Sequence, residues 1–367
     1  MFDEPSAPAL SIVVLVRNEA RFIDRCLRSV FAADPESEEI EVLVVDGMSE
    51  DGTRQILADW SARHPNLRVL DNPDRIVPTA MNIGVRAARG KWIMILGAHC
   101  EYLSDYFRLC LETSRRTGAD NVGGTIITLS RHKGIEGKLV QALTTHPFGV
   151  GNSGFRVGAR EGWTDTVAYG CYRREVFDRI GLFDERLARN QDYEFNRRLL
   201  TSGGRVWYNP AIQARYYNQS SLIRLLSQAF GTGQWNPWMW FVAPYAFAWR
   251  HAIPLVFVTA LVVAFLSTFF APFAGIAVLK FVLVPYFVFA LVASFQQSLR
   301  YGLWMFPCLP VLFWTYHVAY GLGGVWGLCL LIIKRAPVQR VSEPWAGAGS
   351  YRAWPRNGKN VINRAAV

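Results

Sequence analysis

In the first hundred residues, short apolar runs alternate with segments whose apolar side chains recur at helical spacing. The runs are rich in β-branched residues and predict buried strands at residues 10–16, 40–45, 67–70 and 92–96. The segments between them predict helices at residues 22–31, 53–60 and 78–88. Strands and helices that alternate in this way build a mostly parallel sheet flanked by helices, so we expect an α/β fold.

The alternation continues less regularly to about residue 218. It predicts helices at residues 106–117, 174–180 and 190–200, and strands at residues 121–128, 167–171 and 206–208. Residues 144–165 are rich in glycine and polar side chains and show little periodicity, which predicts a functional or mobile loop. We therefore expect residues 1–218 to form one globular domain.

Hydrophobic side chains dominate after about residue 235. Residues 219–250 combine an apolar helical stripe with crowded tryptophans, which is typical of a segment at a membrane interface; a helix docked on the globular domain is the alternative. Within residues 251–333, three apolar stretches are long enough to span a bilayer, at residues 252–271, 274–295 and 304–333. We expect three transmembrane helices, with a very hydrophobic buried helical domain as the alternative.

The distribution of charge raises a question of topology. Residues 334–367 hold seven Lys or Arg side chains against one acid, Glu343, and the positive-inside rule places this basic tail in the cytoplasm. No signal peptide is visible at Met1, so the N-terminal domain is expected there too. Three crossings cannot satisfy both expectations, so one segment is re-entrant, or the last is a bent pair around residues 321–324, or the rule fails here.

The formal net charge of the chain is +10. Nucleic acid is one partner that could explain this charge, and anionic lipid head groups or diphosphate ligands are others. The hydrophobic C-terminal third favours lipids and diphosphates, so we expect no nucleic acid partner.

Polar side chains follow the second and fourth predicted strands. Asp46 lies in a glycine-containing turn before a helix, where it could accept a hydrogen bond from a nucleobase or simply cap the helix. The fourth strand ends in Gly97, Ala98 and His99, followed by Glu101, and ligands bind beyond such ends in open α/β sheets. His99 and Glu101 could hold a divalent cation against a diphosphate, unless His99 is a partly buried histidine satisfied by hydrogen bonds.

A further acid, Asp192, lies at the start of a predicted helix. It could be an ordinary cap, or a general base if an acceptor hydroxyl lies within hydrogen-bond reach. Arg17, Arg75 and Arg189 could neutralise phosphate charge, although surface arginines are common.

Four motifs in order resemble the family 2 glycosyltransferases, which have the GT-A fold, and the resemblance covers about residues 9–235. The motifs are SIVVLVRNE at residues 11–19, VVDGMSEDGT at 44–53, AMNIGVRAARG at 80–90 and NQDYE at 190–194. Within the family, residues 119–124, 146–153 and 189–192 look like the succinoglycan-biosynthesis (ExoA-like) membrane glucosyltransferases of bacteria. The chain as a whole is therefore expected to be a GT-A catalytic domain followed by an interfacial helix and transmembrane helices.

The resemblance implies a role for each candidate residue. Asp192 would be the catalytic base, and His99 a metal ligand with Glu101 as a second candidate. The donor nucleotide would be bound by Val16, Arg17, Asn18, Glu19, Asp46, Gly47, Ser49, Arg75, Asn82, Gly97 and Ala98. The acceptor side would hold Asn152, Ser153, Gly170, Cys171, Arg189, Gln191 and Trp235.

The reaction implied by the resemblance is an inverting sugar transfer. Asp192 would deprotonate an acceptor hydroxyl, which attacks the anomeric carbon of a nucleotide-diphosphate sugar, while a divalent cation (Mn²⁺ or Mg²⁺) stabilises the departing diphosphate. A UDP-sugar is favoured over a GDP-sugar, with glucose as the default. The implied acceptor is a saccharide on a polyprenyl diphosphate, at the cytoplasmic face of a bacterial inner membrane.

Two departures from the family pattern affect this interpretation. The first acid of the family's D-x-D is replaced by Gly97, although His99 fits the last position of the D-A-H found in the ExoA-like group. Metal use is therefore expected to be relaxed, or Glu101 to compensate. The Q-x-x-R-W motif of processive synthases is absent, which argues against a polymerising synthase. A non-catalytic scaffold that binds sugar nucleotides is the other alternative, and the presence of Asp192 and His99 favours the enzyme.

Overall fold

The computed structural model describes residues 8–33, 40–131, 134–218 and 221–335. Its contacts divide the described chain into two units, residues 8–127 with 158–216 and residues 128–157 with 217–335. Residues 128–157, which we expected in the N-terminal domain, thus cluster with the apolar helices. Most of the predicted basic tail, residues 336–367, lies outside the described residues.

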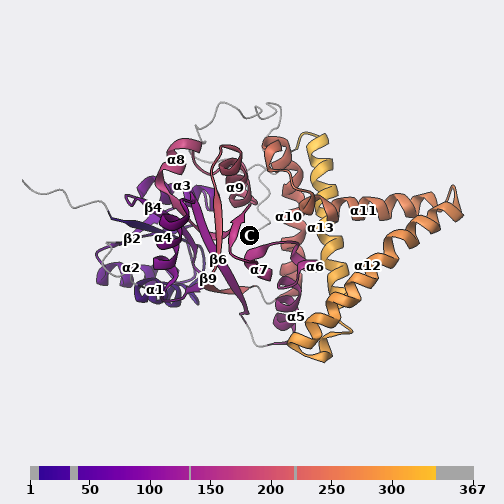
Figure 1. The fold of residues 1–367 in the computed structure, drawn as a ribbon, viewed down its shortest axis with the longest axis horizontal. Coiled ribbons are helices and arrows are strands. Elements are labelled where there is room, and N and C mark those ends of the chain that lie inside the picture. The colour runs from indigo at the N-terminus through magenta and orange to yellow at the C-terminus, as the bar shows by residue number, and fades with distance from the viewer. Residues whose placement is uncertain (1–7, 34–39, 132–133, 219–220, 336–367) are drawn as a thin grey trace, which may run out of the picture. The chain divides into compact units, whose positions relative to one another are not determined.

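The first unit is built on a mixed sheet that has nine strands in the described chain (Figure 1). Its parallel part runs in the order β3 (Leu67–Asp71), β2 (Ile40–Asp46), β1 (Leu10–Val16) and β4 (Trp92–Gly97). It continues with β8 (Ala168–Arg173), β6 (Asn121–Ser130), β9 (Val206–Asn218) and β5 (Cys100–Tyr102), and β7 (Gly162–Thr164) pairs with β9. The predicted α/β class is confirmed, whereas the last strand is much longer than the predicted residues 206–208.

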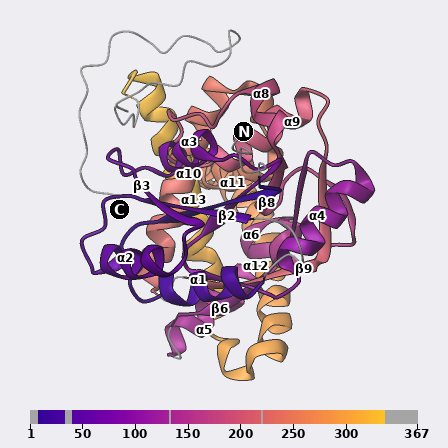
Figure 2. The same cartoon turned by 90° about the vertical axis from the view of Figure 1, so that its left-hand side faces the viewer.

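Helices cover both faces of the parallel strands (Figure 2). One face carries α1 (Ile23–Ala32) and α2 (Thr53–Arg63), and the other carries α3 (Val77–Ala87) and α8 (Arg174–Ile180). Leu10, Ile12 and Val14 of β1 share a core with α1, α2 and α4 (Tyr106–Thr117). A strand covered on both faces is apolar at nearly every position, which explains the continuous apolar run that predicted β1.

The third sequence motif, residues 80–90, holds α3 against the sheet. A Cβ atom on Gly84 would lie 2.2 Å from Cγ1 of Val13, so only glycine lets the helix approach β1 this closely. A Cβ atom on Gly90 would lie 2.6 Å from the backbone nitrogen of Ser11. Both glycines are therefore explained by packing.

Asn82, in the same motif, is fully buried. Its amide nitrogen donates to the carbonyl of Phe183 (2.9 Å) and to Oε1 of Glu185 (2.7 Å), and its oxygen accepts from the backbone nitrogen of Phe183 (2.9 Å). The side chain of Asn82 is buried and its hydrogen bonds are used inside the protein, and its expected contact with the donor nucleotide stays a prediction.

The second unit is helical. Its long helices are α10 (Leu222–Val242), α11 (Trp249–Ser267), α12 (Pro272–Tyr301) and α13 (Leu309–Ile332), and its short ones are α5 (Ile135–Thr144), α6 (Pro147–Val150) and α7 (Gly154–Val157). Among the described helices, α11, α12 and α13 are long and apolar enough to cross a membrane, as the sequence predicted. The predicted loop at residues 144–165 was partly wrong, because α6, α7 and β7 lie within it.

The last apolar segment forms one continuous helix, so a bent pair around residues 321–324 is ruled out. The glycines there allow close helix packing. A Cβ atom on Gly323 would lie 2.0 Å from the carbonyl oxygen of Phe230 in α10, and one on Gly321 would lie 2.3 Å from that of Pro254 in α11. Small residues at helix contacts are typical of membrane helix bundles.

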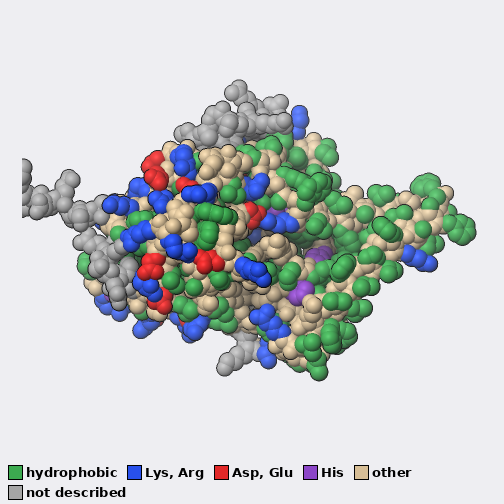
Figure 3. Space-filling model, in the orientation of Figure 1, with side chains coloured by type: hydrophobic (Ala, Val, Ile, Leu, Met, Phe, Trp, Pro, Cys, Tyr) green, Lys and Arg blue, Asp and Glu red, His purple; other side chains and the backbone are tan. Residues whose placement is uncertain are grey.

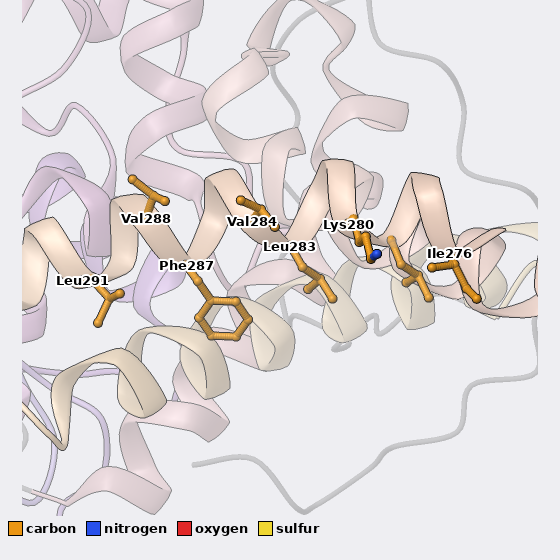
Figure 4. A pocket seen from close by; sticks show the side chains of 8 residues that line it. Ile276, Lys280, Leu283, Val284, Phe287, Val288 and Leu291 are labelled. Atoms are coloured by element: carbon orange, nitrogen blue, oxygen red, sulfur yellow. The ribbon is translucent and has the colours of Figure 1, made fainter. Parts of the chain in front are cut away.

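Large apolar side chains cover the hairpin formed by α11 and α12 (Figures 1 and 3). Phe270 and Phe273, at its turn, are 91% and 93% exposed. Along one face of α12 lies an open groove of about 500 Å³, which seven apolar side chains and Lys280 line (Figure 4). Contiguous apolar surface of this extent is typical of contact with lipid, and it supports membrane association.

Candidate active site

The carboxyl ends of the parallel strands meet at one edge of the sheet. Val16 at the end of β1 pairs with Asp46 at the end of β2, and Leu15 pairs with Gly97 at the end of β4. The loops that follow these strands therefore start side by side. They contain most of the residues that the sequence assigned to the donor nucleotide and the metal.

Two of these loops are tied together by hydrogen bonds. The backbone nitrogen of Asn18 donates to Oγ of Ser49 (2.8 Å), and Oδ1 of Asn18 accepts from the backbone nitrogen of Glu50 (2.9 Å). Asn18 and Met48 have positive φ angles of 54° and 58°. Such backbone conformations are costly outside glycine and concentrate at functional sites.

Asp46 is buried at the base of this edge. Its carboxylate accepts hydrogen bonds from the backbone nitrogen and hydroxyl of Ser49 and pairs with Nη1 of Arg54 at 3.0 Å. Arg54 also pairs with Asp71 at 2.9 Å. Asp46 therefore holds the loop in place, and base recognition by this carboxylate, which stays a prediction, would require Arg54 to move.

Two arginines lie beside the same loops. Arg17 packs against Gly47, where an added Cβ would lie 3.1 Å from Cδ of Arg17, and its Nη1 donates to the carbonyl of Arg75 (3.3 Å). Nε of Arg17 is buried without a hydrogen-bond partner among the described residues. Arg75 has a φ of 60° and lies 3.6 Å from Glu50. A buried donor of this kind is suited to a phosphate oxygen.

His99 follows β4, and its Nδ1 lies 3.1 Å from Oε1 of Glu19. The ring also contacts Tyr216 with centroids 5.1 Å apart. Because a carboxylate only accepts, Nδ1 must carry the proton, which leaves Nε2 as the lone-pair nitrogen of the neutral ring. A carboxylate that orients a histidine in this way is common beside metal ions, so the pair fits a divalent cation.

Glu101 differs from His99 in its surroundings. Its Oε1 pairs with Arg25 at 3.1 Å, and its Oε2 lies 3.6 Å from Arg215. These two cations engage both carboxylate oxygens, and the suggestion that Glu101 compensates for the missing acid stays a prediction. The described residues contain no cluster of three or more His, Cys, Asp or Glu side chains able to hold a metal. A cation would therefore need diphosphate oxygens to complete its coordination.

Asp192 lies in the first turn of α9 (Gln191–Thr201) and is exposed. Its Oδ1 accepts from the backbone nitrogen of Tyr193 at 2.8 Å. Asn190, just before the helix, is left-handed with a φ of 64°. Burial and the charge of Asp192 both raise the pKa of the nearby Tyr172 phenol. An exposed carboxylate on a strained turn is suited to meet an incoming hydroxyl.

Arg189 and Gln191 flank this turn. Burial lowers the pKa of the Arg189 guanidinium, which forms no hydrogen bond or ion pair with any other described residue. Oε1 of Gln191 is also buried without a hydrogen-bond partner in the described chain. Buried polar groups are normally paired, so both residues have capacity for a ligand.

Buried contacts of Arg198 and Glu194 hold the first turns of α9 in place. Arg198 and Glu194 form a buried ion pair at 2.8 Å, and Nη1 of Arg198 donates to the carbonyls of Ile180 and Leu182 (2.8 Å each). These contacts fix the first turns of the helix, where Asp192 is exposed.

Three expected acceptor-side residues, Asn152, Ser153 and Trp235, belong to the second unit. Ser153 Oγ donates to the carbonyl of Val150 (3.2 Å), and Trp235 is buried in α10. Their acceptor role stays a prediction.

Gly170 and Cys171 in β8 are buried, and their acceptor role stays a prediction. A Cβ atom on Gly170 would lie 2.3 Å from Oδ1 of Asn121, so this glycine is explained by packing. The neighbouring Tyr169, which the sequence did not single out, contacts Gly97 instead. Tyr169 lies outside the recognised motifs, so the sequence did not indicate this contact.

Comparison with known proteins identifies the family of this chain. The family model described as glycosyl transferase family 2 matches residues 11–181. A Methanococcus voltae protein, the dolichyl N-acetyl-α-D-glucosaminyl phosphate 3-β-D-2,3-diacetamido-2,3-dideoxy-β-D-glucuronosyltransferase, is 30% identical over 61% of this chain and 71% of its own length. The succinoglycan biosynthesis protein ExoA of Rhizobium meliloti is 30% identical over 63% of this chain and 70% of its own length.

A solved structure has the same fold over most of the chain. The mannosyltransferase PcManGT from Pyrobaculum calidifontis, in complex with GDP-Man and Mn²⁺, aligns with a TM-score of 0.54 and 17% identity. The alignment covers 87% of this chain and 88% of that one.

Proposed function

Because the chain belongs to the family 2 glycosyltransferases, we propose that it transfers one sugar from a nucleotide-diphosphate donor to a lipid-linked saccharide, with inversion. The observation that carries the proposal is the edge of the sheet where the ends of β1, β2 and β4 meet. There the Glu19–His99 pair offers contacts for a diphosphate, as does Nε of Arg17, which has no hydrogen-bond partner among the described residues.

The donor would lie across this edge. Arg17 and Arg75 would contact phosphate oxygens, and the loops after β1 and β2 would hold the nucleoside. His99, oriented by Glu19, would contribute Nε2 to a divalent cation, with Mn²⁺ or Mg²⁺ as candidates. Such an ion supplies charge neutralisation for the departing diphosphate. A protein of this fold, PcManGT, is in complex with GDP-Man and Mn²⁺, which supports both a nucleotide-sugar donor and a divalent cation.

The reaction would proceed by direct displacement at the anomeric carbon. Asp192 takes the proton of an acceptor hydroxyl, and the hydroxyl oxygen forms a bond to the anomeric carbon from the face opposite the diphosphate. The bond from that carbon to the diphosphate oxygen breaks, and the nucleoside diphosphate leaves with the electron pair. Arg189 lies three residues before Asp192 in the sequence and has no partner among the described residues. Its guanidinium would stabilise the negative charge that develops on the departing diphosphate.

We propose a UDP-sugar as donor and a polyprenyl-diphosphate-linked saccharide as acceptor, with glucose as the default sugar. The three apolar helices support an acceptor that resides in a membrane. Succinoglycan biosynthesis by the relative ExoA supports a role in exopolysaccharide assembly. Our proposal places the catalytic domain at the cytoplasmic face of a bacterial inner membrane.

The test is transfer by the full chain in lipid nanodiscs. A panel of UDP- and GDP-sugars is offered with a bacterial lipid extract, with and without Mn²⁺, and products are analysed by mass spectrometry. We expect one donor to add a single sugar to a lipid. Several added sugars would indicate a processive synthase, and donor binding without any transfer would indicate a non-catalytic scaffold.

A further inference from the structure

Helices α10 and α13 run side by side, in the same direction, through the helical unit. A Cβ atom on Gly323 would lie 2.0 Å from the carbonyl oxygen of Phe230, and one on Gly327 would lie 2.3 Å from that of Gln234. A step of four residues along α13 therefore matches a step of four residues along α10. Because the two helices are parallel and in close contact, any depth that α13 has in a membrane is shared by the adjoining turns of α10.

The first two turns of α10 are too polar to lie in hydrocarbon. Arg224, Ser227 and Gln228 are exposed there. Followed back along both helices, the register places them beside residues 317–321, which form the middle of α13. The middle of a membrane-spanning helix lies near the bilayer midplane, where an exposed arginine or glutamine is strongly unfavourable. The attachment of α10 therefore argues against a crossing by α13.

Helix α11 leaves α13 after its first turns. A Cβ atom on Gly321 would lie 2.3 Å from the carbonyl oxygen of Pro254, and one on Gly324 would lie 3.1 Å from Cβ of Leu255. Beyond this contact α11 runs outward, across the direction of α10 and α13, and forms the hairpin with α12 (Figures 1 and 2). Helices α11 and α13 therefore cannot both stand perpendicular to one bilayer.

The hairpin of α11 and α12 has the character that a membrane-embedded segment requires. Residues 252–279 contain no Asp, Glu, Lys or Arg. Near the turn, the hydroxyls of Ser267 and Thr268 donate to the carbonyls of Val263 (2.7 Å) and Phe265 (2.6 Å). The 19 residues of α11 make about 28 Å of helix, close to the hydrocarbon thickness of about 30 Å. The hairpin can therefore cross the bilayer and return.

One cation, Lys280, lies within the apolar part of α12 and is exposed. It follows the first residue of α12, Pro272, by about 12 Å of helix. A lysine at this distance from the turn can extend its long side chain to the lipid head groups of the far leaflet. Lys280 is therefore compatible with a hairpin that crosses the bilayer.

The apolar character of α13 has another explanation. Neighbouring helices cover one side of it, and the hydroxyl of Tyr320 accepts from Nδ2 of Asn236 in α10 (2.9 Å). Its exposed apolar side chains include Leu322, Trp326 and Ile333, which recur at helical spacing and share one face. A helix with one covered side and an exposed apolar face that carries tryptophan is suited to the membrane interface.

We propose that, among the described helices, α11 and α12 cross the bilayer as a hairpin, whereas α10 and α13 lie along the interface that the hairpin leaves and returns to. The chain that precedes α11 and the end of α13 are then on one side of the bilayer. The number of crossings is even, which agrees with the positive-inside rule applied to the basic sequence of residues 334–367.

The first test reads the side of each chain end in a bacterial host. The full chain carries green fluorescent protein at Met1 or at Val367, or alkaline phosphatase at Val367; the first reporter fluoresces only in the cytoplasm, and the second is active only in the periplasm. We expect fluorescence from both ends and no phosphatase activity. Phosphatase activity at Val367 together with fluorescence at Met1 would overturn the proposal.

A matched control shows that both reporters respond to one additional crossing. A run of about 21 leucines between Val367 and the reporter is long enough to span the bilayer and should invert both signals at this end. Immunoblots of the fusions confirm equal amounts of full-length chain.

The second test measures the depth of α13 in lipid nanodiscs by electron paramagnetic resonance. Spin labels are placed on Val311→Cys, Leu322→Cys and Ile333→Cys, three exposed positions on one face, with the exposed Cys308 and Cys329 replaced by serine. An interfacial α13 should hold the three labels at one depth, within about 5 Å. A spanning α13 would place the label at residue 322 about 16 Å deeper than the other two, which would overturn the proposal.

The depth reference is Val262→Cys, an exposed position within α11. Its label should lie deeper than all three labels on α13, because α11 enters the bilayer. Neither test uses a sugar donor or an acceptor. Failure of this proposal therefore leaves the proposed sugar transfer untouched, and absence of transfer leaves the membrane arrangement untouched.

Discussion

The polar side chains of the strand-end loops differ from those at the start of α9 in their hydrogen-bond partners within the protein. In the loops, Asn18, Asp46 and Ser49 bond to one another and to their neighbours. At the start of α9, Asp192 is exposed and Arg189 has no partner in the described chain. Hydrogen bonds within the protein hold the loops in place, whereas Arg189 before α9 keeps its capacity for a ligand. Substitutions in the loops should therefore affect stability and binding, and substitutions near Asp192 should affect turnover.

The largest effect is expected for Asp192→Asn. Loss of the general base should lower kcat by about 10³-fold, while nucleotide affinity and the thermal midpoint stay unchanged. Transfer rates from the nanodisc assay, calorimetry and thermal unfolding give the three readouts. Asp178→Asn, on the exposed side of α8, is the control and should keep full turnover. Wild-type turnover in Asp192→Asn would exclude this residue as the base.

Arg189→Gln should have the second largest effect on turnover. Removing a cation that stabilises transition-state charge should lower kcat/KM by about 10²-fold. The thermal midpoint should stay level or rise, because a partly buried charge without a described partner does not stabilise the fold. Arg68→Gln, at an exposed position of β3, should change neither quantity. A marked loss of stability in Arg189→Gln would show a structural role instead.

Asp46→Asn tests the assembled region. It weakens the buried contacts to Ser49 and Arg54 and should lower the free energy of unfolding by about 2 kcal/mol, with weaker nucleotide binding. The matched control is Asp71→Asn, which removes the other, exposed partner of Arg54 and should cost less than about 0.5 kcal/mol. Equal stability losses in chemical denaturation would mean that burial of Asp46 is unimportant.

Glu19→Gln should weaken the binding of the divalent cation. It weakens the orientation of His99, so the Kd for Mn²⁺ in the presence of nucleotide should rise about tenfold. Glu101→Gln is the control, because Arg25 and Arg215 engage Glu101 and its loss should leave Mn²⁺ affinity unchanged. The opposite pattern would identify Glu101, and not His99, as the metal ligand.

The smallest effect concerns Glu185, which accepts from Asn82 near α9. Burial raises the pKa of Glu185 above its ordinary value of 4.5. An acid with a raised pKa in the folded state favours folding when protonated, so its contribution falls as the pH rises from about 4.5 towards the raised pKa. Glu185→Gln should therefore raise the thermal midpoint slightly at pH 8 and leave it unchanged at pH 4. A lower midpoint at pH 8 would contradict this.

Much of the fold could be predicted because the patterns involved are local. The β-branched runs of β1, β2 and β4 predicted buried strands, and the long apolar stretches predicted α11 to α13. The sequence left the role of a residue open where its type fits two functions. Asn82 and Gly84 belong to a recognisable motif, but the motif serves packing between α3 and the rest of the first unit. Likewise, a glycine-rich stretch around residues 321–324 can bend a helix or admit a neighbouring one, and here it does the latter.

The sequence by itself determined the α/β class, the apolar helices and the order of the candidate acids, because hydrophobic period and motif spacing are written along the chain. Only the tertiary structure decided which groups meet. The pairing of β1 with β4 brings Glu19 near His99, and the pairing of β4 with β8 brings Tyr169 against Gly97. These partners are distant in sequence, and their contact depends on strand register and side-chain direction. No local pattern encodes that information, so these contacts could be found only in the fold.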